Sequence, residues 1–207
     1  MPIAWVFVSL ALILRTAGGG WDASAKQAAV AIARAAVRAA VLGDRPPSLP
    51  ADLPEPLRER RGCFVTLTVG ARTRGCMGTL FPREANLAAE IAASAAAAAV
   101  ADPFHRPVRK DELPRLKYQI SVVVGRPRPA RSLSELKPAV LGLCVRSGGR
   151  GGVMLPGEAR TARWQMEMAK KKAGVRPGEH VDSLLFRTLV IRSSSAHYGQ
   201  DCGQLGD

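Results

Sequence analysis

The chain alternates between segments whose apolar residues recur at helical spacing and segments whose apolar and polar residues alternate like those of a strand. Residues 24–42 place small apolar side chains three and four positions apart, which predicts an amphipathic helix capped by Ser24 and ended by Gly43. Residues 82–101 are almost entirely alanine and other small apolar residues, which favours a second helix buried against a sheet. Residues 158–173 predict a third helix.

Strand patterns lie between and after these helices. Residues 116–124 alternate in polarity, which is typical of a half-buried strand that ends at Gly125. Residues 141–146 and 151–156 predict two strands around a glycine-rich turn, and residues 183–191 predict the last strand. Short turns between successive strands favour antiparallel pairing.

Residues 61–80 predict a hairpin whose loop is Gly70-Ala71, because glycine at the first loop position suits a type II′ turn. If Val69 pairs with Arg72, Val65 lies opposite Cys76 and Cys63 lies opposite Gly78. Cys76 would then share the apolar face with Cys63 and be buried. The alternative is a bulge at Gly75, which would move Cys76 to the other face and toward the surface.

The second strand of this hairpin holds the main candidate site. Gly75 and Gly78 flank Cys76 inside a strand, where glycine makes sense if another backbone or a ligand must come close. Arg74 could pair with an anionic ligand. Alternatively, Cys76 is a catalytic nucleophile whose thiolate is favoured by Arg74, although no base is identifiable nearby in the sequence. The ligand-binding candidates are Arg74, Gly75, Gly78, Thr79, Arg146 and Arg150.

The last two of these arginines flank the turn at residues 147–149. Successive backbone N–H groups in such a turn can form an anion-binding nest, and a flexible hairpin tip is the alternative. The loop at residues 102–107 carries His105 beside Arg106, and a solvated loop histidine is the plain interpretation.

The formal net charge of +13 suits an anionic partner such as nucleic acid, but the arginines are scattered and no nucleic-acid-binding motif is present. The four cysteines are far apart in sequence and show no metal-ligand spacing with the histidines, so we expect free thiols and no metal. No motif implies a cofactor.

The two ends differ from the body of the chain. Residues 1–22 contain an apolar run whose length suits a secretion signal. Because no Lys or Arg precedes the run, a miscalled start codon is the alternative. Residues 193–207 are polar and predicted to be disordered. We expect a cytoplasmic protein, with export as the alternative.

Several ordered motifs carry a family resemblance: residues 62–67, the hexapeptide Arg74-Gly-Cys-Met-Gly-Thr79, residues 101–103, 143–148 and 152–156, Trp164 and residues 172–175. With these, the chain over residues 23–192 resembles the AMMECR domain family, which includes proteins called AmmeMemoRadiSam system protein A. The resemblance implies an α+β fold, mainly an antiparallel sheet packed with helices, in two packed lobes with the hexapeptide at a cleft. It also implies a pathway shared with radical-SAM and MEMO-like proteins. The chain departs from the family pattern at Thr73, Met77, Gly157 and Lys170.

The leading functional hypothesis is an accessory module that binds an anionic small molecule or a partner segment. The alternatives are a Cys76-dependent enzyme and a nucleic-acid-associated protein of a basic cellular process.

Overall fold

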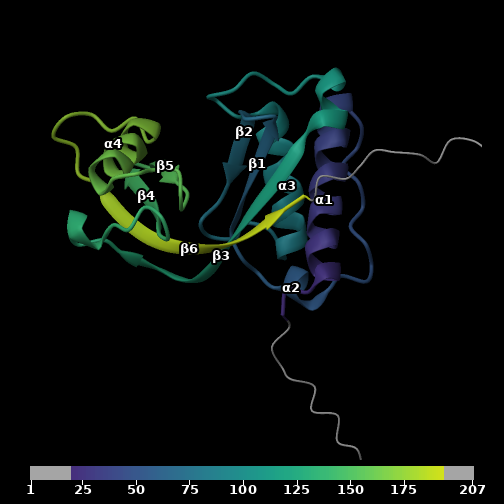
Figure 1. The fold of residues 1–207 in the computed structure, drawn as a ribbon, viewed down its shortest axis with the longest axis horizontal. Helices are drawn as coiled ribbons and strands as arrows, with labels where there is room; N and C mark the ends of the chain where they lie inside the picture. Colours follow the sequence, from purple (N-terminus) through teal and green to yellow (C-terminus); the bar gives the residue numbers. More distant parts are fainter. Residues whose placement is uncertain (1–19, 194–207) are drawn as a thin grey trace, which may run out of the picture.

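The computed structural model describes residues 20–193 (Figure 1). The helices are α1 (Ala23–Leu42), α2 (Glu55–Arg58), α3 (Leu87–Val100) and α4 (Ala162–Lys172), with short 3-10 segments η1 (Lys110–Arg115) and η2 (Leu133–Glu135). The strands are β1 (Cys63–Val69), β2 (Arg72–Gly78), β3 (Lys117–Pro129), β4 (Gly142–Ser147), β5 (Arg150–Met154) and β6 (Asp182–Arg192). Most of the predicted leader (residues 1–22) and of the predicted tail (residues 193–207), with Cys202, lies outside the described residues.

All six strands form one sheet in the order β2-β1-β3-β6-β4-β5, and every neighbouring pair is antiparallel. The long strands β3 and β6 curve through the whole molecule and join two lobes (Figure 1). The first lobe places α3 against β1 and β2, with α1 packed on α3 and β3, and the second lobe places α4 against β4 and β5. The predicted α+β, two-lobed architecture is confirmed.

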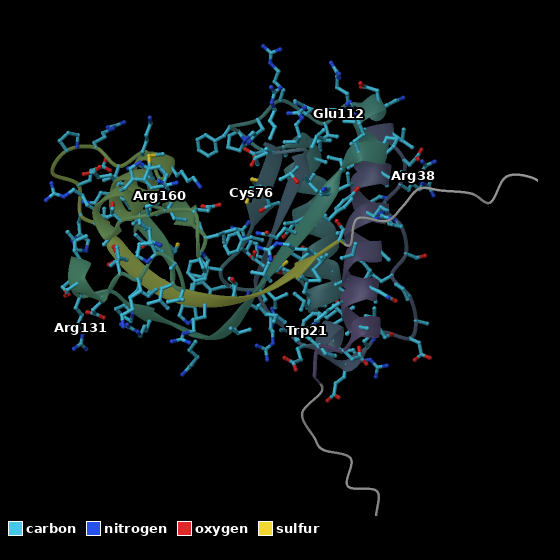
Figure 2. All side chains as sticks on the ribbon, in the orientation of Figure 1. Trp21, Arg38, Cys76, Glu112, Arg131 and Arg160 are labelled. Atoms are coloured by element: carbon cyan, nitrogen blue, oxygen red, sulfur yellow. The ribbon has the colours of Figure 1, made fainter. Side chains whose placement is uncertain are left out.

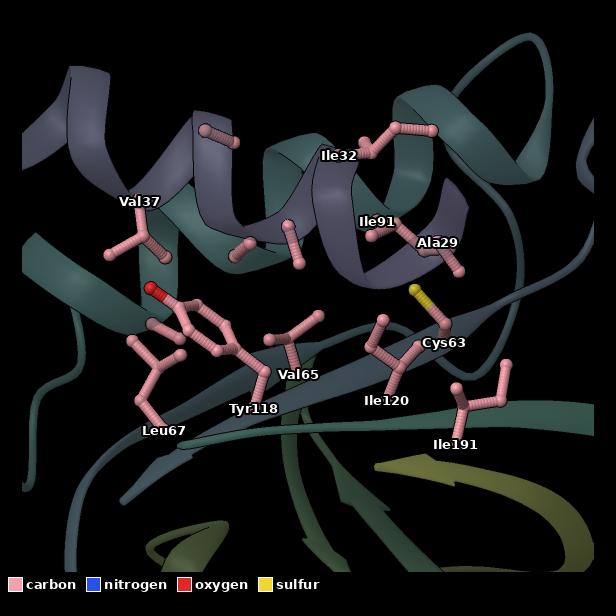
Figure 3. Packing of buried hydrophobic residues seen from close by; sticks show 14 of the residues in the cluster. Ala29, Ile32, Val37, Cys63, Val65, Leu67, Ile91, Tyr118, Ile120 and Ile191 are labelled. Atoms are coloured by element: carbon pink, nitrogen blue, oxygen red, sulfur yellow. The ribbon is translucent and has the colours of Figure 1, made fainter. Parts of the chain in front are cut away.

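The first lobe depends on the small side chains of its helices. Alanines on α1 and α3 let both helices lie close to the sheet, where Val65, Ile91 and Ile120 are fully buried (Figure 3). Each buried aliphatic side chain of this size contributes about 1.5–3 kcal/mol. The start of α1 differs from the prediction, because the Asp22 carboxylate, rather than Ser24, caps the helix by accepting the Ala25 N–H at 2.7 Å.

Strand β3 extends beyond the prediction. The strand does not end at Gly125 but continues to Pro129, with an irregular register after Val124 and a positive φ of 69° at Gly125. Val122 and Val123 are both buried, because the first-lobe helices cover one face of the sheet and the second lobe approaches the other. The expected alternation of buried and exposed residues is therefore lost at the middle of the strand.

The second lobe has its own apolar core, and a third cluster joins it to the first lobe. In that cluster Phe64 of β1 stacks on Phe186 of β6, with ring centroids 5.9 Å apart. Cys76, Val153 and Leu184 pack at its edge. The curved sheet thus brings its two ends into the same apolar cluster. Among residues 20–193, no helix combines the length and apolar character needed to cross a membrane.

Candidate functional site

Strand β2 contains a bulge at Arg74. Val69 pairs with Arg72 as predicted, but Thr68 then pairs with Thr73 while Leu67 pairs with Gly75, so Arg74 is the extra residue. The pairing of Val65 with Cys76 is therefore wrong, since Thr66 lies opposite Cys76 instead. The bulged alternative is correct in effect, with the extra residue one position earlier than expected. A bulge redirects the side chains around it, and here it turns Arg74 toward the loop that precedes η1.

The space beside the glycines on either side of Cys76 is occupied by the protein's own backbone. A Cβ atom on Gly75 would lie 1.8 Å from the carbonyl oxygen of Ala98 in α3, and one on Gly78 would lie 2.1 Å from the carbonyl oxygen of Cys63. The predicted close approach of a backbone is thus real, but the backbones belong to α3 and β1. The expectation that these glycines leave an opening for a ligand is wrong. The second lobe has the same kind of close contact between a strand glycine and a helix, because Gly152 faces the backbone of α4.

Cys76 lies on the face of the sheet that is turned toward the second lobe, opposite the face that carries Cys63 (Figure 2). Its thiol is half-buried, and its Sγ lies 3.2 Å from the Thr66 hydroxyl oxygen. Burial raises the pKa of the thiol, and the hydrogen bond from Thr66 offsets this only in part. The expected stabilisation of a thiolate by Arg74 is absent, because that guanidinium is bound to Glu112. The described residues place no histidine in hydrogen-bond contact with the thiol.

Asp102 organises the loop that follows α3. Its carboxylate is 8% exposed and accepts three hydrogen bonds: from the Cys76 N–H at 2.7 Å, from the Phe104 N–H at 2.7 Å and from His105 Nδ1 at 2.9 Å. The bond to His105 places a proton on Nδ1 of the ring. One buried carboxylate therefore fixes the loop at residues 102–105 against strand β2.

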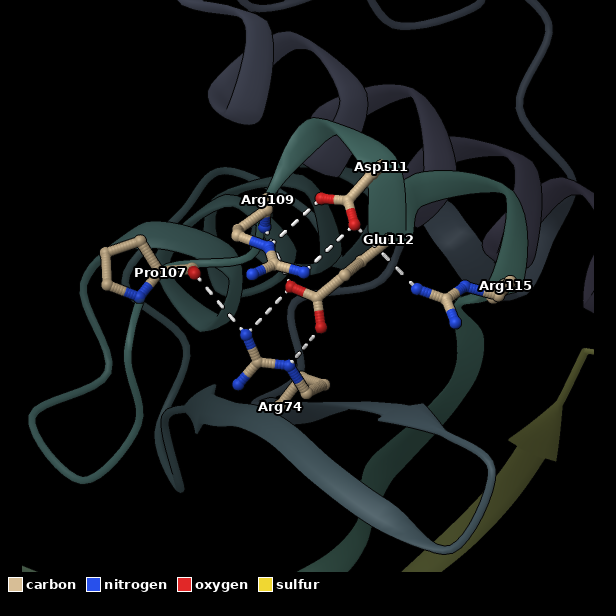
Figure 4. A network of polar contacts seen from close by, with 6 residues as sticks. All are labelled: Arg74, Pro107, Arg109, Asp111, Glu112 and Arg115. Atoms are coloured by element: carbon tan, nitrogen blue, oxygen red, sulfur yellow. Dashed lines mark hydrogen bonds and ion pairs between the residues drawn. The ribbon is translucent and has the colours of Figure 1, made fainter.

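Arg74 is fixed by a second carboxylate (Figure 4). Its Nε and Nη2 donate to the two oxygens of Glu112 at 2.6 and 2.8 Å, and both side chains are largely shielded from water. The guanidinium, together with the Arg109 N–H at 2.9 Å, lowers the pKa of Glu112 to about 2. The same pair raises the pKa of Arg74. Nη1 of Arg74 makes no hydrogen bond within residues 20–193. The ion pair with Glu112 therefore leaves one nitrogen of the guanidinium able to donate to a ligand.

The carboxylates of Asp102 and Glu112 fix the segments that line a surface pocket of about 740 Å³. Its lining comes from the start of β2, from the loop before η1 and from η1 itself: Arg72, Thr73, Arg74, Phe104, His105, Arg106, Pro107, Arg109 and Glu112. Four arginines thus face one carboxylate. Arg74 and Arg109 pair with Glu112 and Asp111, whereas Arg72 and Arg106 are exposed and make no ion pair in the described part of the chain. The pocket therefore carries uncompensated positive charge, which suits an anion.

Comparison with known proteins decides the family. The AMMECR1 family profile matches residues 30–190. The chain belongs to the AMMECR1 family.

Relatives of this AMMECR1-family protein occur in bacteria and archaea. A protein of Thermotoga maritima is 40% identical over 144 residues, which cover 68% of this chain and 82% of that protein. A protein of Methanothermobacter thermautotrophicus is 36% identical over 181 residues, covering 83% and 92% of the two chains. The crystal structure of the uncharacterized protein PH0010 from Pyrococcus horikoshii superposes with a TM-score of 0.72 at 25% identity, over 81% of this chain and 90% of that one.

In this member of the AMMECR1 family the remaining predicted site residues lie away from the pocket. The Thr79 hydroxyl donates to the buried Glu90 carboxylate at 2.8 Å. Arg146 and Arg150 belong to the β4–β5 hairpin, two strands that lie beyond β6 in the sheet. Arg150 is held by the Glu179 carboxylate at 2.5 Å and by the Gly174 carbonyl, so its charge is already paired. The structure brings only Arg74 of the predicted ligand-binding residues to the pocket.

The sequence reasoning did not identify Arg72, Asp102, Phe104, Arg106 and Glu112 as site residues. The composition of residues 102–107 could have drawn attention to that loop, because a phenylalanine, a histidine and an arginine follow an Asp-Pro turn. The pairing of Glu112 with Arg74 joins residues far apart in sequence and left no local pattern.

Proposed function

We propose that this AMMECR1-family protein is an accessory binding module that captures an anionic ligand in the pocket between β2 and the loop before η1. The observation that supports this most directly is the pair of exposed guanidiniums, Arg72 and Arg106, which line the pocket without a carboxylate partner among the described residues. Arginine binds carboxylate and phosphate oxygens through paired N–H donors. Arg74 adds a third guanidinium whose position Glu112 fixes beforehand.

Pre-organisation distinguishes this pocket from a simple charged surface. Long side chains lose conformational freedom when they bind, which costs about 0.5–1.5 kcal/mol for each immobilised side chain. Glu112 has already fixed Arg74, and Asp102 has already fixed the loop that carries Arg106. An anion that enters the pocket therefore orders mainly Arg72 and Arg106.

The test is calorimetric titration with inorganic pyrophosphate at low ionic strength, using the wild type, Arg72→Gln and Arg106→Gln. We expect wild-type binding that weakens with added salt, and about tenfold weaker binding for each variant, since a charge-assisted hydrogen bond contributes about 1.5–3 kcal/mol. Arg131→Gln is the matched control, because Arg131 is an exposed arginine of the second lobe (Figure 2). Equal loss in the control, or no wild-type binding, would contradict the proposal.

The module is further proposed to act with radical-SAM and MEMO-like proteins, as the family resemblance implies. Mixing the purified proteins and measuring their sedimentation should reveal a complex. If the three sediment independently with and without pyrophosphate, this part of the proposal fails.

The Cys76-dependent enzyme is the weaker alternative. A nucleophilic cysteine needs a thiolate, and burial raises the pKa of this thiol away from neutrality.

A further inference from the structure

The most exposed large apolar side chain of the described residues lies in the basic pocket. Phe104 is 65% exposed, more than Phe81 at 51% or Trp164 at 44%. It lines the pocket together with the four arginines. Its backbone is not loose, because its N–H donates to Asp102 Oδ1 at 2.7 Å. A flat ring is thus held in the open beside guanidinium groups that have no carboxylate partner among the described residues.

An aromatic face beside guanidinium groups matches a particular ligand chemistry. Proteins that bind single-stranded nucleic acid combine a positive surface for the phosphates with aromatic rings on which the bases stack, and a single nucleotide offers the same two groups. A purely inorganic anion would gain nothing from Phe104, since its contacts would all come from N–H donors. A carboxylate-bearing aliphatic ligand would not need a flat ring either.

We propose that the anion taken by the pocket is the phosphate of a nucleotide, with its base stacked on Phe104 and its phosphate oxygens bound by Arg72 and Arg106. This rests on the proposed function, because it specifies the ligand of the same pocket. The nucleotide comes either as a free molecule or as a unit of a single strand, and the net charge of +13 is compatible with both. The two sources share the stacked base and the bound phosphate.

The experiment compares ligands that carry or lack the base. Titrations at fixed low salt use ADP, pyrophosphate, an eight-nucleotide single strand and the matching duplex. Alanine replacement of a stacking aromatic costs about 1–3 kcal/mol per base, so ADP should bind at least about fivefold more tightly than pyrophosphate. Phe104→Leu should abolish that difference while leaving pyrophosphate binding unchanged, and Phe104→Trp should preserve it.

Phe81→Leu is the matched control, since Phe81 is an exposed phenylalanine that does not line the pocket. If the single strand binds more tightly than ADP and Phe104→Leu removes the advantage, the nucleotide belongs to a strand. Equal affinity for ADP and for the single strand would show that the ligand is a free nucleotide. If ADP and pyrophosphate bind equally, or if the duplex binds best, the nucleotide assignment is overturned while anion binding stands. If pyrophosphate does not bind at all, the proposed function itself fails.

Discussion

Replacing Glu112 by glutamine should remove much of the stabilisation that fixes Arg74. The guanidinium and the Arg109 N–H lower the pKa of Glu112 from 4.5 to about 2. A shift of that size corresponds to roughly 3 kcal/mol of folding free energy at neutral pH. The exposed side-chain fractions are 15% for Arg74 and 11% for Glu112, so solvent screens the pair little. Loss of one partner of such a pair leaves the other charge without compensation.

The sign of the pH dependence follows from the lowered pKa. Glu112 stabilises the fold fully above its unfolded pKa of 4.5, and this contribution is lost as pH falls toward its folded pKa of about 2. The difference in unfolding free energy between wild type and Glu112→Gln should therefore be about 3 kcal/mol at about pH 6 and about half of that at about pH 3. At the lower pH the carboxyl is protonated in the unfolded chain but still largely ionised in the folded protein, so the unfolded state gains a proton and the advantage of the folded state shrinks.

Urea unfolding followed by circular dichroism at several pH values measures this difference. Glu135→Gln is the matched control, because Glu135 pairs with Arg128 on the exposed surface of the second lobe, where the effect should be much smaller. A difference for Glu112→Gln that does not change with pH, or one no larger than the control, would refute the assignment of the stabilisation to the ion pair.

Two further predictions concern strand β2. Gly75→Ala should destabilise the fold by about 1–3 kcal/mol or more in urea unfolding, because its Cβ would overlap the Ala98 carbonyl at 1.8 Å. Gly151→Ala, whose Cβ has no neighbour closer than 3.9 Å, should have little effect, and similar losses for both would show that α3 does not seat on Gly75. Cys76 should react with a disulfide reagent near pH 8 more slowly than a free thiol, because burial raises its pKa. Cys63, whose pKa is raised to about 12, should react only after unfolding, and a fast phase that disappears in Cys76→Ser would contradict the assignment for Cys76.

The sequence predicted the order and type of the main elements because their apolar periodicity is strong. It predicted the helix at residues 24–42 within a few residues and the hairpin loop at Gly70-Ala71, since glycine there has the positive φ of 59° that the turn needs. The end of β3 was misplaced because a glycine and two prolines usually stop a strand, whereas Gly125 here sits at an irregularity within it.

The candidate site was harder to predict because it depends on one extra residue and on distant contacts. A bulge at Arg74 moves Cys76 to the opposite face, and no residue type at that position announces it. Gly75 indicated a close approach, but only the fold shows that α3 makes it. Asp102, after α3, and Glu112, in η1, contact β2 from positions distant in sequence, so their roles follow from tertiary structure alone.

The most direct measurement is a crystal structure with tungstate, whose anomalous scattering locates an anion that mimics phosphate. We expect the strongest tungstate site between Arg72 and Arg106, beside the fixed Arg74, and no such site in crystals of the double variant Arg72→Gln, Arg106→Gln. A strongest site at the β4–β5 hairpin tip near Arg146, with the pocket empty in the wild type, would contradict it.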